Sequence, residues 1–171
     1  AAGVCAICRN LHGQVNCAIA GQKERRMAVH LLKLCVGVAT IDDLARWQAM
    51  PRNTRLHGGV RVAVHRTFQM PSRHSELLSG GSLYWVIKGC ILVRQKLVGF
   101  TDGHKKDGSP CCIFLLDRTL VPVRPLPRRA FQGWRYLDAA DAPKDLPRGK
   151  HDDVRDMPVP MRKKLADLGL L

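Results

Sequence analysis

The chain has 171 residues, of which 46% are hydrophobic and 25% are charged, values typical of a globular domain. No stretch approaches the roughly 20 consecutive apolar residues that a membrane-spanning helix requires, and 15 Gly and 10 Pro without a repeating period exclude a collagen-like chain. The 28 Lys and Arg against 14 Asp and Glu give a net charge of +14, which favours an anionic partner.

The positive charge is concentrated in one part of the chain. Between Arg46 and Arg135 there are sixteen Lys or Arg against four acids, whereas six Asp outnumber four basic residues between Asp138 and Asp156. Arg predominates in the basic segment, and its planar guanidinium matches phosphate and stacks on bases. The segment is therefore either an anion-binding face or a solvated basic surface.

Residues 1–26 differ from the rest because they show no clear helical or strand period. A hydrophobic run begins abruptly at Met27, so we expect the preceding residues to be a non-native or disordered extension, translated from sequence upstream of the true start. A transit peptide is the alternative, since the segment is poor in acids and ends in basic residues. A single CxxC pair is weak evidence for zinc, so we predict no metal site from the candidate ligands Cys5, Cys8, His12 and Cys17.

The first expected elements are a strand and a helix. Residues 29–36 form an apolar run that predicts a buried strand, closed by a glycine. Thr40 is a typical N-cap for a helix that runs to about Met50, and Asp42 and Asp43 suit the positive end of its dipole. These two Asp are adjacent and do not face one another on the helix, so we interpret them as capping residues and not as a catalytic pair.

The middle of the chain predicts mainly strands. Residues 60–68 alternate between two faces, which predicts a strand, and residues 71–78 predict a short helix. Two further strands are expected at 83–88 and 90–100, with a bulge or sharp bend at Gly89 between them.

The last part of the chain predicts a hairpin, an edge strand and a helix. The loop at 101–110 is rich in Asp, Gly and Lys and indicates a hairpin connection. The apolar run 111–116 predicts a central strand, and 119–124 predicts a strand that nearby prolines place at a sheet edge. A final short helix is expected from about Pro160 to Leu168.

These elements predict the fold class. Five or six strands, mostly consecutive after residue 60, with three short helices indicate an α+β fold with a small, mostly antiparallel, barrel-like sheet. We expect one α+β domain at residues 27–147, followed by a tail at 148–171 that carries the last helix. Seven Cys are an odd number without an export signal, so we expect reduced thiols, no disulfides and a cytoplasmic location.

Common catalytic motifs are missing from the sequence, which has no P-loop, GxGxxG, HExxH or GxSxG. His57, His65, His74 and Glu76 occur in one stretch, and chance clustering accounts for them better than a metal or acid–base site. An enzyme acting on a nucleotide or nucleic acid would use His65 or Glu76 as acid or base. It would hold one of them in a concave pocket with a perturbed pKa.

The sequence GSLYWVIKG is more specific. Alternation places Tyr84 and Lys88 on one face of a strand and Trp85 on the other. A ring beside a cation on an exposed strand face can hold single-stranded nucleic acid, with the base on the ring and the phosphate on the cation. The next strand adds Arg94 and Lys96 on one face. The alternative is that Tyr84 and Trp85 both pack in the core.

Residues 127–136 (PRRAFQGWRY) hold three Arg and three aromatic residues. Interleaved Arg and aromatic rings can stack on bases or clamp phosphates. The alternative is that Phe131, Trp134 and Tyr136 seal one end of the barrel.

Three blocks of the sequence, 27–37 (MAVHLLKLCVG), 80–89 (GGSLYWVIKG) and 127–136, resemble a bacterial family catalogued as domain of unknown function 1489. The resemblance covers residues 27 to about 147 and brings no established activity, so it implies no catalytic residue. A fainter similarity, limited to the Tyr-Trp strand and the element order, is to PUA-like barrels, including the ASCH and EVE groups. That similarity implies RNA or modified-base recognition by analogy of fold.

We therefore expect an RNA-binding module with a PUA-like α+β barrel, without metal or cofactor. The alternatives are an enzyme directed at nucleotides or nucleic acid, and a basic adaptor that docks an acidic protein. Tyr84 or Trp134 would stack a base, and the residues expected to neutralise phosphates are Arg61, Arg66, Lys88, Arg94, Lys96, Arg128, Arg129 and Arg135.

Overall fold

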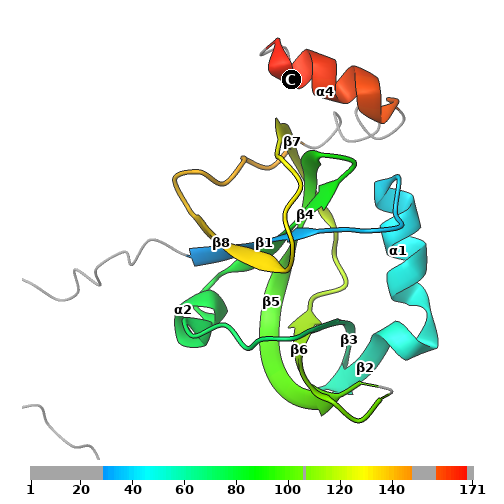
Figure 1. Cartoon of the computed structure of the whole chain (residues 1–171), viewed down its shortest axis with the longest axis vertical. Coiled ribbons are helices and arrows are strands. Elements are labelled where there is room, and N and C mark those ends of the chain that lie inside the picture. Colours follow the sequence, from blue (N-terminus) through cyan, green and yellow to red (C-terminus); the bar gives the residue numbers. More distant parts are fainter. Residues whose placement is uncertain (1–28, 106, 148–156, 169–171) are drawn as a thin grey trace, which may run out of the picture.

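The computed structural model describes residues 29–105, 107–147 and 157–168. Within these ranges the chain forms eight strands, three α-helices and one short 3₁₀ helix (Figure 1). The strands are β1 (Val29–Leu34), β2 (Thr54–His57), β3 (Val60–Thr67), β4 (Ser82–Ile87), β5 (Cys90–His104), β6 (Pro110–Leu116), β7 (Val121–Pro127) and β8 (Trp134–Asp138). The helices are α1 (Ile41–Ala49), α2 (His74–Leu78) and α4 (Val159–Asp167), and the 3₁₀ helix η1 spans Pro51–Asn53.

The sheet is mixed but mostly antiparallel. Its strands follow the order β2-β3-β6-β5-β4-β1-β8, and β7 pairs with β5 beside this path. β1 and β4 are parallel, and the other strand pairs in the described ranges are antiparallel. The end strands β2 and β8 do not pair with each other, so the sheet is open. This arrangement confirms the predicted α+β class with a mostly antiparallel, barrel-like sheet.

β5 joins the two parts of the sheet because it is 15 residues long. Its first part pairs with β4 and β7, and its second part pairs with β6 from Leu97 onward. The register shifts between Ile91 and Val93 and again between Leu97 and Gly99, and the strand is strongly curved (Figure 1). Register irregularities of this kind increase bend and twist, so β5 wraps the sheet into a partial barrel.

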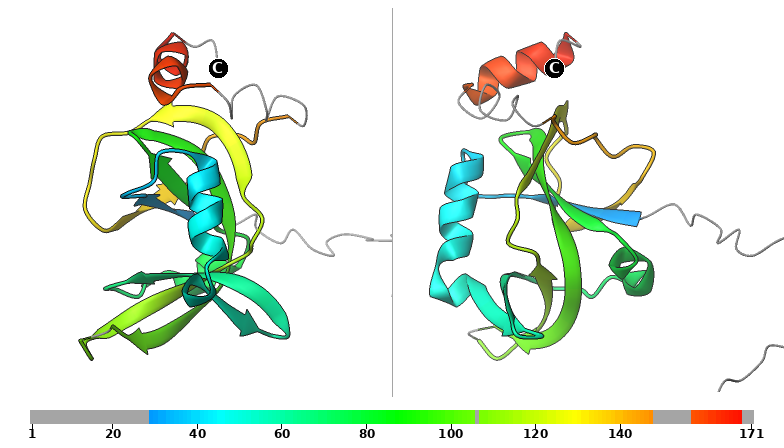
Figure 2. Two further views of the ribbon diagram at one scale, coloured as in Figure 1. Left: turned by 90° about the vertical axis from the view of Figure 1, so that its right-hand side faces the viewer. Right: turned by 180° about the vertical axis from the view of Figure 1, so that it is seen from behind.

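α1 begins at the predicted position, in a capping box. Thr40 Oγ1 accepts a hydrogen bond from the backbone N–H of Asp43, and the Asp43 carboxylate accepts one from the N–H of Thr40, both at 3.0 Å. Hydrogen bonds from Arg46 and from Thr40 hold the pKa of Asp43 below its usual range. α1 and α2 lie on opposite sides of β5 (Figures 1 and 2), and α1 buries Leu44 and Gln48.

Two hydrophobic clusters lie on opposite faces of β4, all six residues of which are buried. Trp85 belongs to the larger cluster, and Tyr84 belongs to the smaller one together with Leu32. Tyr84 is 4% exposed, and its ring packs edge-on against His30 with centroids 5.3 Å apart. The prediction of an exposed β4 face with Tyr84 available to a base is therefore wrong. Both aromatic residues of β4 pack in the core, because each face of the strand is covered.

A buried network of hydrogen bonds connects α1 to the sheet. Gln48 and Gln95 exchange two side-chain amide hydrogen bonds of 2.8 and 2.7 Å. Trp85 Nε1 donates to Gln95 Oε1 at 2.8 Å, and Gln95 Nε2 donates to the backbone carbonyl of Asp117 at 2.9 Å. The fully buried Gln95 side chain thus joins α1, β4 and the turn after β6.

Several boundaries differ from the sequence predictions. The sequence predicts neither β2 nor β8, because β2 has no buried side-chain pattern of its own and β8 forms through pairing with β1. α2 begins three residues later than predicted, at His74. Lys88 and Gly89 have φ values of 50° and 82°, so they form a two-residue hairpin turn. Of the two alternatives predicted at Gly89, the structure therefore has the sharp bend and not the bulge.

The remaining predicted elements are confirmed. β6 lies between β3 and β5, and the proline-rich β7 pairs only with β5 among the named strands. α4 is the predicted last helix and packs against β7 (Figure 1). The expectations for residues 1–26, including the candidate zinc ligands, lie outside the described residues.

The described cysteines, Cys35, Cys90, Cys111 and Cys112, are free thiols. None of the described helices has the length and apolar character needed to cross a membrane.

Candidate functional site

Two hollows lie on either side of β1, because consecutive side chains of a strand point to opposite faces. Leu32 lines one of them, on the side of its β8 partner Arg135, and Lys33 lines the other. We name the first the arginine hollow, lined by Leu32, residues 127–131, residues 135–138 and Asp141. We name the second the His65 pocket, lined by residues 33–38, Leu44, Trp47, His65, Arg66 and Trp85.

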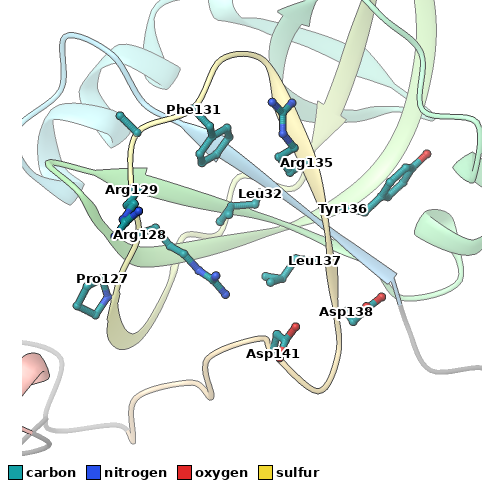
Figure 3. A pocket seen from close by; sticks show the side chains of 11 residues that line it. Leu32, Pro127, Arg128, Arg129, Phe131, Arg135, Tyr136, Leu137, Asp138 and Asp141 are labelled. Atoms are coloured by element: carbon teal, nitrogen blue, oxygen red, sulfur yellow. The ribbon is translucent and has the colours of Figure 1, made fainter.

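The arginine hollow has a volume of about 530 Å³. The connection between β7 and β8 forms one wall, and β8 with the turn after it forms the other (Figure 3). Arg128 extends across the hollow toward Leu137, while Phe131 and Arg135 lie together at one end (Figure 3). Arg129 is exposed. The predicted residues Arg128, Arg129 and Arg135 therefore meet around one concave surface.

Arg128 is fixed by its backbone but not by its side chain. Its N–H donates to the carbonyl of Gly89 at 2.8 Å, which seats residues 127–129 on the β4–β5 turn that carries Lys88. Its Nε is buried and has no hydrogen-bond partner among the described residues. An unsatisfied buried donor costs about 1–3 kcal/mol, so a ligand that supplies an acceptor to this Nε would bind more tightly.

Phe131 and Arg135 form a cation–π pair at the end of the hollow. The guanidinium carbon of Arg135 lies 5.8 Å from the centroid of the Phe131 ring, and Arg135 Nη1 donates to the carbonyl of Trp134 at 3.0 Å. Phe131 is half-buried against the smaller hydrophobic cluster. An aromatic ring and a guanidinium thus share one surface, as nucleic-acid stacking platforms require.

One carboxylate, that of Asp141, lies at the opposite rim, whereas the Asp138 side chain points away from the hollow on the face of β8 that carries Tyr136 (Figure 3). Asp138 and Asp141 are joined by a turn in which the Asp141 N–H donates to the Asp138 carbonyl at 3.0 Å. The ion pairs formed within the described ranges involve none of the three arginines of the hollow. Among the described residues, the hollow therefore combines three guanidinium groups outside any ion pair with one carboxylate that accepts hydrogen bonds.

Two predicted site residues already have structural partners. Arg94 forms a bidentate ion pair with Asp145, with two N–O distances of 2.6 Å, and these hydrogen bonds raise the pKa of Arg94. Trp134 lies on the other face of β8, where its Nε1 donates to the carbonyl of Gln69 at 3.2 Å and its ring packs against Tyr136. Neither side chain belongs to the arginine hollow.

The other predicted residues are dispersed. Arg61 and Lys96 are exposed and line neither hollow, and Lys88 is exposed in the turn beside Arg128. Arg66 lines the His65 pocket. The structure therefore groups three of the predicted residues in one hollow and separates the others from it.

The His65 pocket has a volume of about 420 Å³ and is assembled from α1, β1 with its following loop, β3 and β4. The His65 ring packs edge-on against Trp85, with centroids 5.1 Å apart, and lies 6.4 Å from the ring of Trp47. Both nitrogens of His65 are buried, and neither has a hydrogen-bond partner in the part of the chain that the structure describes.

Burial controls the protonation states of the titratable side chains in this pocket. It lowers the pKa of His65 to about 3, with help from the positive charges of Lys33 and Arg66. Burial also lowers the pKa of Lys33, whose amine donates to the carbonyl of Gly133 at 3.1 Å, and raises the pKa of the Cys35 thiol to about 11. At neutral pH His65 is therefore uncharged and Cys35 is protonated.

These features bear on the enzyme alternative. His65 lies in a concave pocket with a shifted pKa, but a pKa of about 3 is far from the value that a general acid or base needs near pH 7. Glu76 lies in neither hollow and forms an ion pair with Arg73 at 2.7 Å. The pocket is thus better suited to hydrogen bonding with a ligand than to proton transfer.

No three His, Cys, Asp or Glu side chains of the described residues gather closely enough to hold a metal ion.

Sequence reasoning missed several residues of both hollows. Phe131 is one of three rings in 127–136 that the sequence offers either for base stacking or for sealing the barrel, and the expected binding residues include Trp134 in its place. Asp138 and Asp141 come from the acidic segment that begins there. Lys33 and Trp47 have no local signal, because the pocket that they share forms only when α1 docks beside β1.

Comparison with known proteins identifies the family but no relative of known activity. No match to the chain was found among curated proteins or solved structures. The similarity to PUA-like barrels therefore stays a prediction. A family model described as "Protein of unknown function (DUF1489)" matches residues 31–171, which extends beyond the expected limit at residue 147 to include α4. The chain belongs to this DUF1489 family.

Proposed function

We propose that this protein binds RNA through the arginine hollow. The observation that carries the proposal is the convergence of Arg128, Arg129 and Arg135 on one concave surface beside the ring of Phe131. Guanidinium groups offer paired donors that match phosphate oxygens, and an aromatic ring accepts a base of any sequence. The net charge of +14 adds long-range attraction for a polyanion.

Arg128 supports phosphate in particular as the ligand group. Its Nε is buried without a partner in the described ranges, so a phosphate oxygen would supply the missing acceptor. Hydrogen bonds to charged groups contribute about 1.5–3 kcal/mol, which exceeds the contribution of a neutral pair. Because this Nε is buried, the Arg128 side chain has to shift to meet the phosphate, while its backbone stays bonded to Gly89.

The carboxylate of Asp141 favours RNA over DNA. It is an acceptor without donor hydrogens, and it would repel a second phosphate at its rim. A ribose 2′-hydroxyl can donate to such a carboxylate, and a deoxyribose cannot. We therefore place the phosphate at the arginines, the base on Phe131 and the sugar toward Asp141.

The test is fluorescence anisotropy of the full chain with short single-stranded RNA and DNA of the same sequence, from about 50 to 200 mM salt. Each phosphate contact to a single strand contributes about 0.7 to the salt slope, so three arginines account for a slope of about two. The triple variant Arg128→Gln, Arg129→Gln, Arg135→Gln should lose that slope and bind RNA at least tenfold more weakly. Arg129→Gln and Arg135→Gln alone, both at exposed side chains, should each lower the slope by about 0.7 without affecting folding.

A matched control removes the same charge elsewhere. Arg52→Gln, Arg55→Gln, Arg118→Gln changes three exposed arginines that line neither hollow, so it should keep the slope and most of the affinity. Equal weakening by both triple variants would show that only overall charge matters. Absence of binding to both nucleic acids would overturn the proposal and direct attention to an acidic protein partner.

A further inference from the structure

We propose that the His65 pocket is a second binding site that accepts one nucleotide, with its base against Trp47 and His65 and its phosphate at Arg66. This proposal goes beyond RNA binding at the arginine hollow and does not depend on it. Leu32 and Lys33 are consecutive residues of β1 that line different hollows, so the two sites lie on opposite faces of the strand.

The polar chemistry of the pocket favours a ligand with hydrogen-bonding groups. Both nitrogens of His65 are buried and unpartnered in the described part of the chain, and a neutral imidazole offers one donor and one acceptor. Such an unsatisfied group in a native structure calls for an explanation, and a ligand that supplies its partners is one. The edge of a nucleobase presents neighbouring donors and acceptors, which complement the two nitrogens of His65.

The charge of the pocket favours an anionic ligand. Lys33 and Arg66 are its two basic residues, and none of its lining residues is an Asp or Glu. Arg66 lines the pocket and is exposed, so its side chain is free to adjust to a phosphate, whereas the amine of Lys33 donates to the carbonyl of Gly133 at 3.1 Å. Both cations lie close enough to His65 to lower its pKa, so an anion bound by them would lie near the imidazole.

The walls of the pocket suit a flat ring. Trp47 is half-buried and contributes an indole surface, while Val36 is 83% exposed at the rim, an unusual exposure for a branched apolar side chain. A volume of about 420 Å³ lies in the range of small-molecule sites, about 300–1,000 Å³. Contact with the His65 nitrogens requires a neighbouring side chain to move, and Lys33 has the most flexible stem in the pocket.

The nucleotide could be free or could be one unpaired nucleotide of an RNA strand, since both present the same base and phosphate. Isothermal titration calorimetry of the full chain with AMP, GMP, CMP and UMP tests the first source. Binding of an RNA hairpin with one bulged nucleotide, compared with the same hairpin without the bulge, tests the second. We expect at least one monophosphate or the bulged hairpin to bind in a way that depends on His65.

The variants separate the contacts. His65→Leu should weaken binding at least tenfold, and Arg66→Gln should weaken the monophosphate tenfold while leaving binding of the matching nucleoside unchanged. Arg61→Gln is the matched control, because it removes one charge from the same strand and lines neither hollow. Arg66 is exposed, so its variant keeps the test valid if His65→Leu fails to fold.

The outcomes distinguish this proposal from the previous one. The triple variant of the arginine hollow should retain nucleotide binding in the His65 pocket, even where it loses the RNA salt slope. No binding of any monophosphate up to about 10 mM, together with equal affinity of His65→Leu and the unmodified chain for the bulged hairpin, would overturn the inference. Binding that is indifferent to both His65→Leu and Arg66→Gln would also overturn it, because the ligand would then lie elsewhere.

Discussion

Replacing Gln95 with Leu should destabilise the protein more than any other single change in its buried polar network. The substitution leaves four groups without partners: the Trp85 indole N–H, the Asp117 carbonyl, and the amide oxygen and nitrogen of Gln48. Each unsatisfied buried group costs about 1–3 kcal/mol, and burial of the apolar Leu side chain offsets part of the total. We expect the free energy of unfolding to fall by about 3–5 kcal/mol, a large share of the 5–15 kcal/mol of a typical domain.

Gln48→Leu is the matched comparison, because it removes the same amide from the other end of the pair. Gln95 then keeps its bonds to Trp85 and Asp117, so the expected loss is only about 1–2 kcal/mol. The double variant should cost less than the sum of the two single variants, because neither Gln amide then remains buried without its partner.

Urea unfolding followed by circular dichroism measures these differences, with an unchanged m value as the check on two-state behaviour. If Gln95→Leu costs no more than Gln48→Leu, the hydrogen bonds to Trp85 and Asp117 do not contribute as the geometry indicates. Strict additivity of the two substitutions would likewise contradict the reciprocal amide pair.

Three further predictions concern close packing, a hydroxyl and pH. Gly81→Ala would place a Cβ 2.4 and 2.6 Å from two backbone carbonyl oxygens, so we expect a loss of about 3 kcal/mol and a melting temperature about 6–12 °C lower. Tyr136→Phe removes the acceptor of the Arg73 N–H at 3.1 Å, which should cost about 1 kcal/mol in urea unfolding; no change would show that this bond is exchanged for water without cost. Burial holds the pKa of His65 at about 3 against 6.5 when unfolded, so the unfolded chain binds a proton first on acidification. Stability should therefore decline as the pH falls from about 6.5 toward 3, and His65→Leu should remove this part of the decline in unfolding free energy.

Local signals in the sequence predicted the parts of the fold that depend on few residues. Thr40 and Asp43 form the capping box from positions three residues apart, and the apolar runs of β1 and β6 predict buried strands without knowledge of their partners. β2 and β8 are short and half exposed, so pairing with β3 and β1 decides their conformation. No local pattern carries that information.

The same distinction between local signals and tertiary packing explains which parts of the candidate sites the sequence predicted. Arg128, Arg129 and Arg135 are close in sequence, and one connection between two strands brings them together, so composition alone predicted a common site. Alternation places Tyr84 on a definite face of β4, but it does not show that the smaller hydrophobic cluster covers that face.

The His65 pocket shows the limit most clearly. It combines residues from β1, α1, β3 and β4, which are separated along the chain by up to about fifty positions. His65 and Arg66 belong to a strand whose alternation the sequence predicts, yet the approach of Trp47 depends on how α1 packs. Sites of this kind form through tertiary packing, so a search for sequence motifs does not detect them.

The measurement that tests the central claim most directly is photo-crosslinking of the full chain to a short single-stranded RNA containing 4-thiouridine, followed by mass spectrometry of the crosslinked peptides. RNA bound at the arginine hollow should yield adducts within residues 127–137, above all at Phe131, and the triple arginine variant should abolish them. Adducts confined to β2, β3 or other basic surfaces, or adducts in the hollow that survive the triple substitution, would contradict the proposed site.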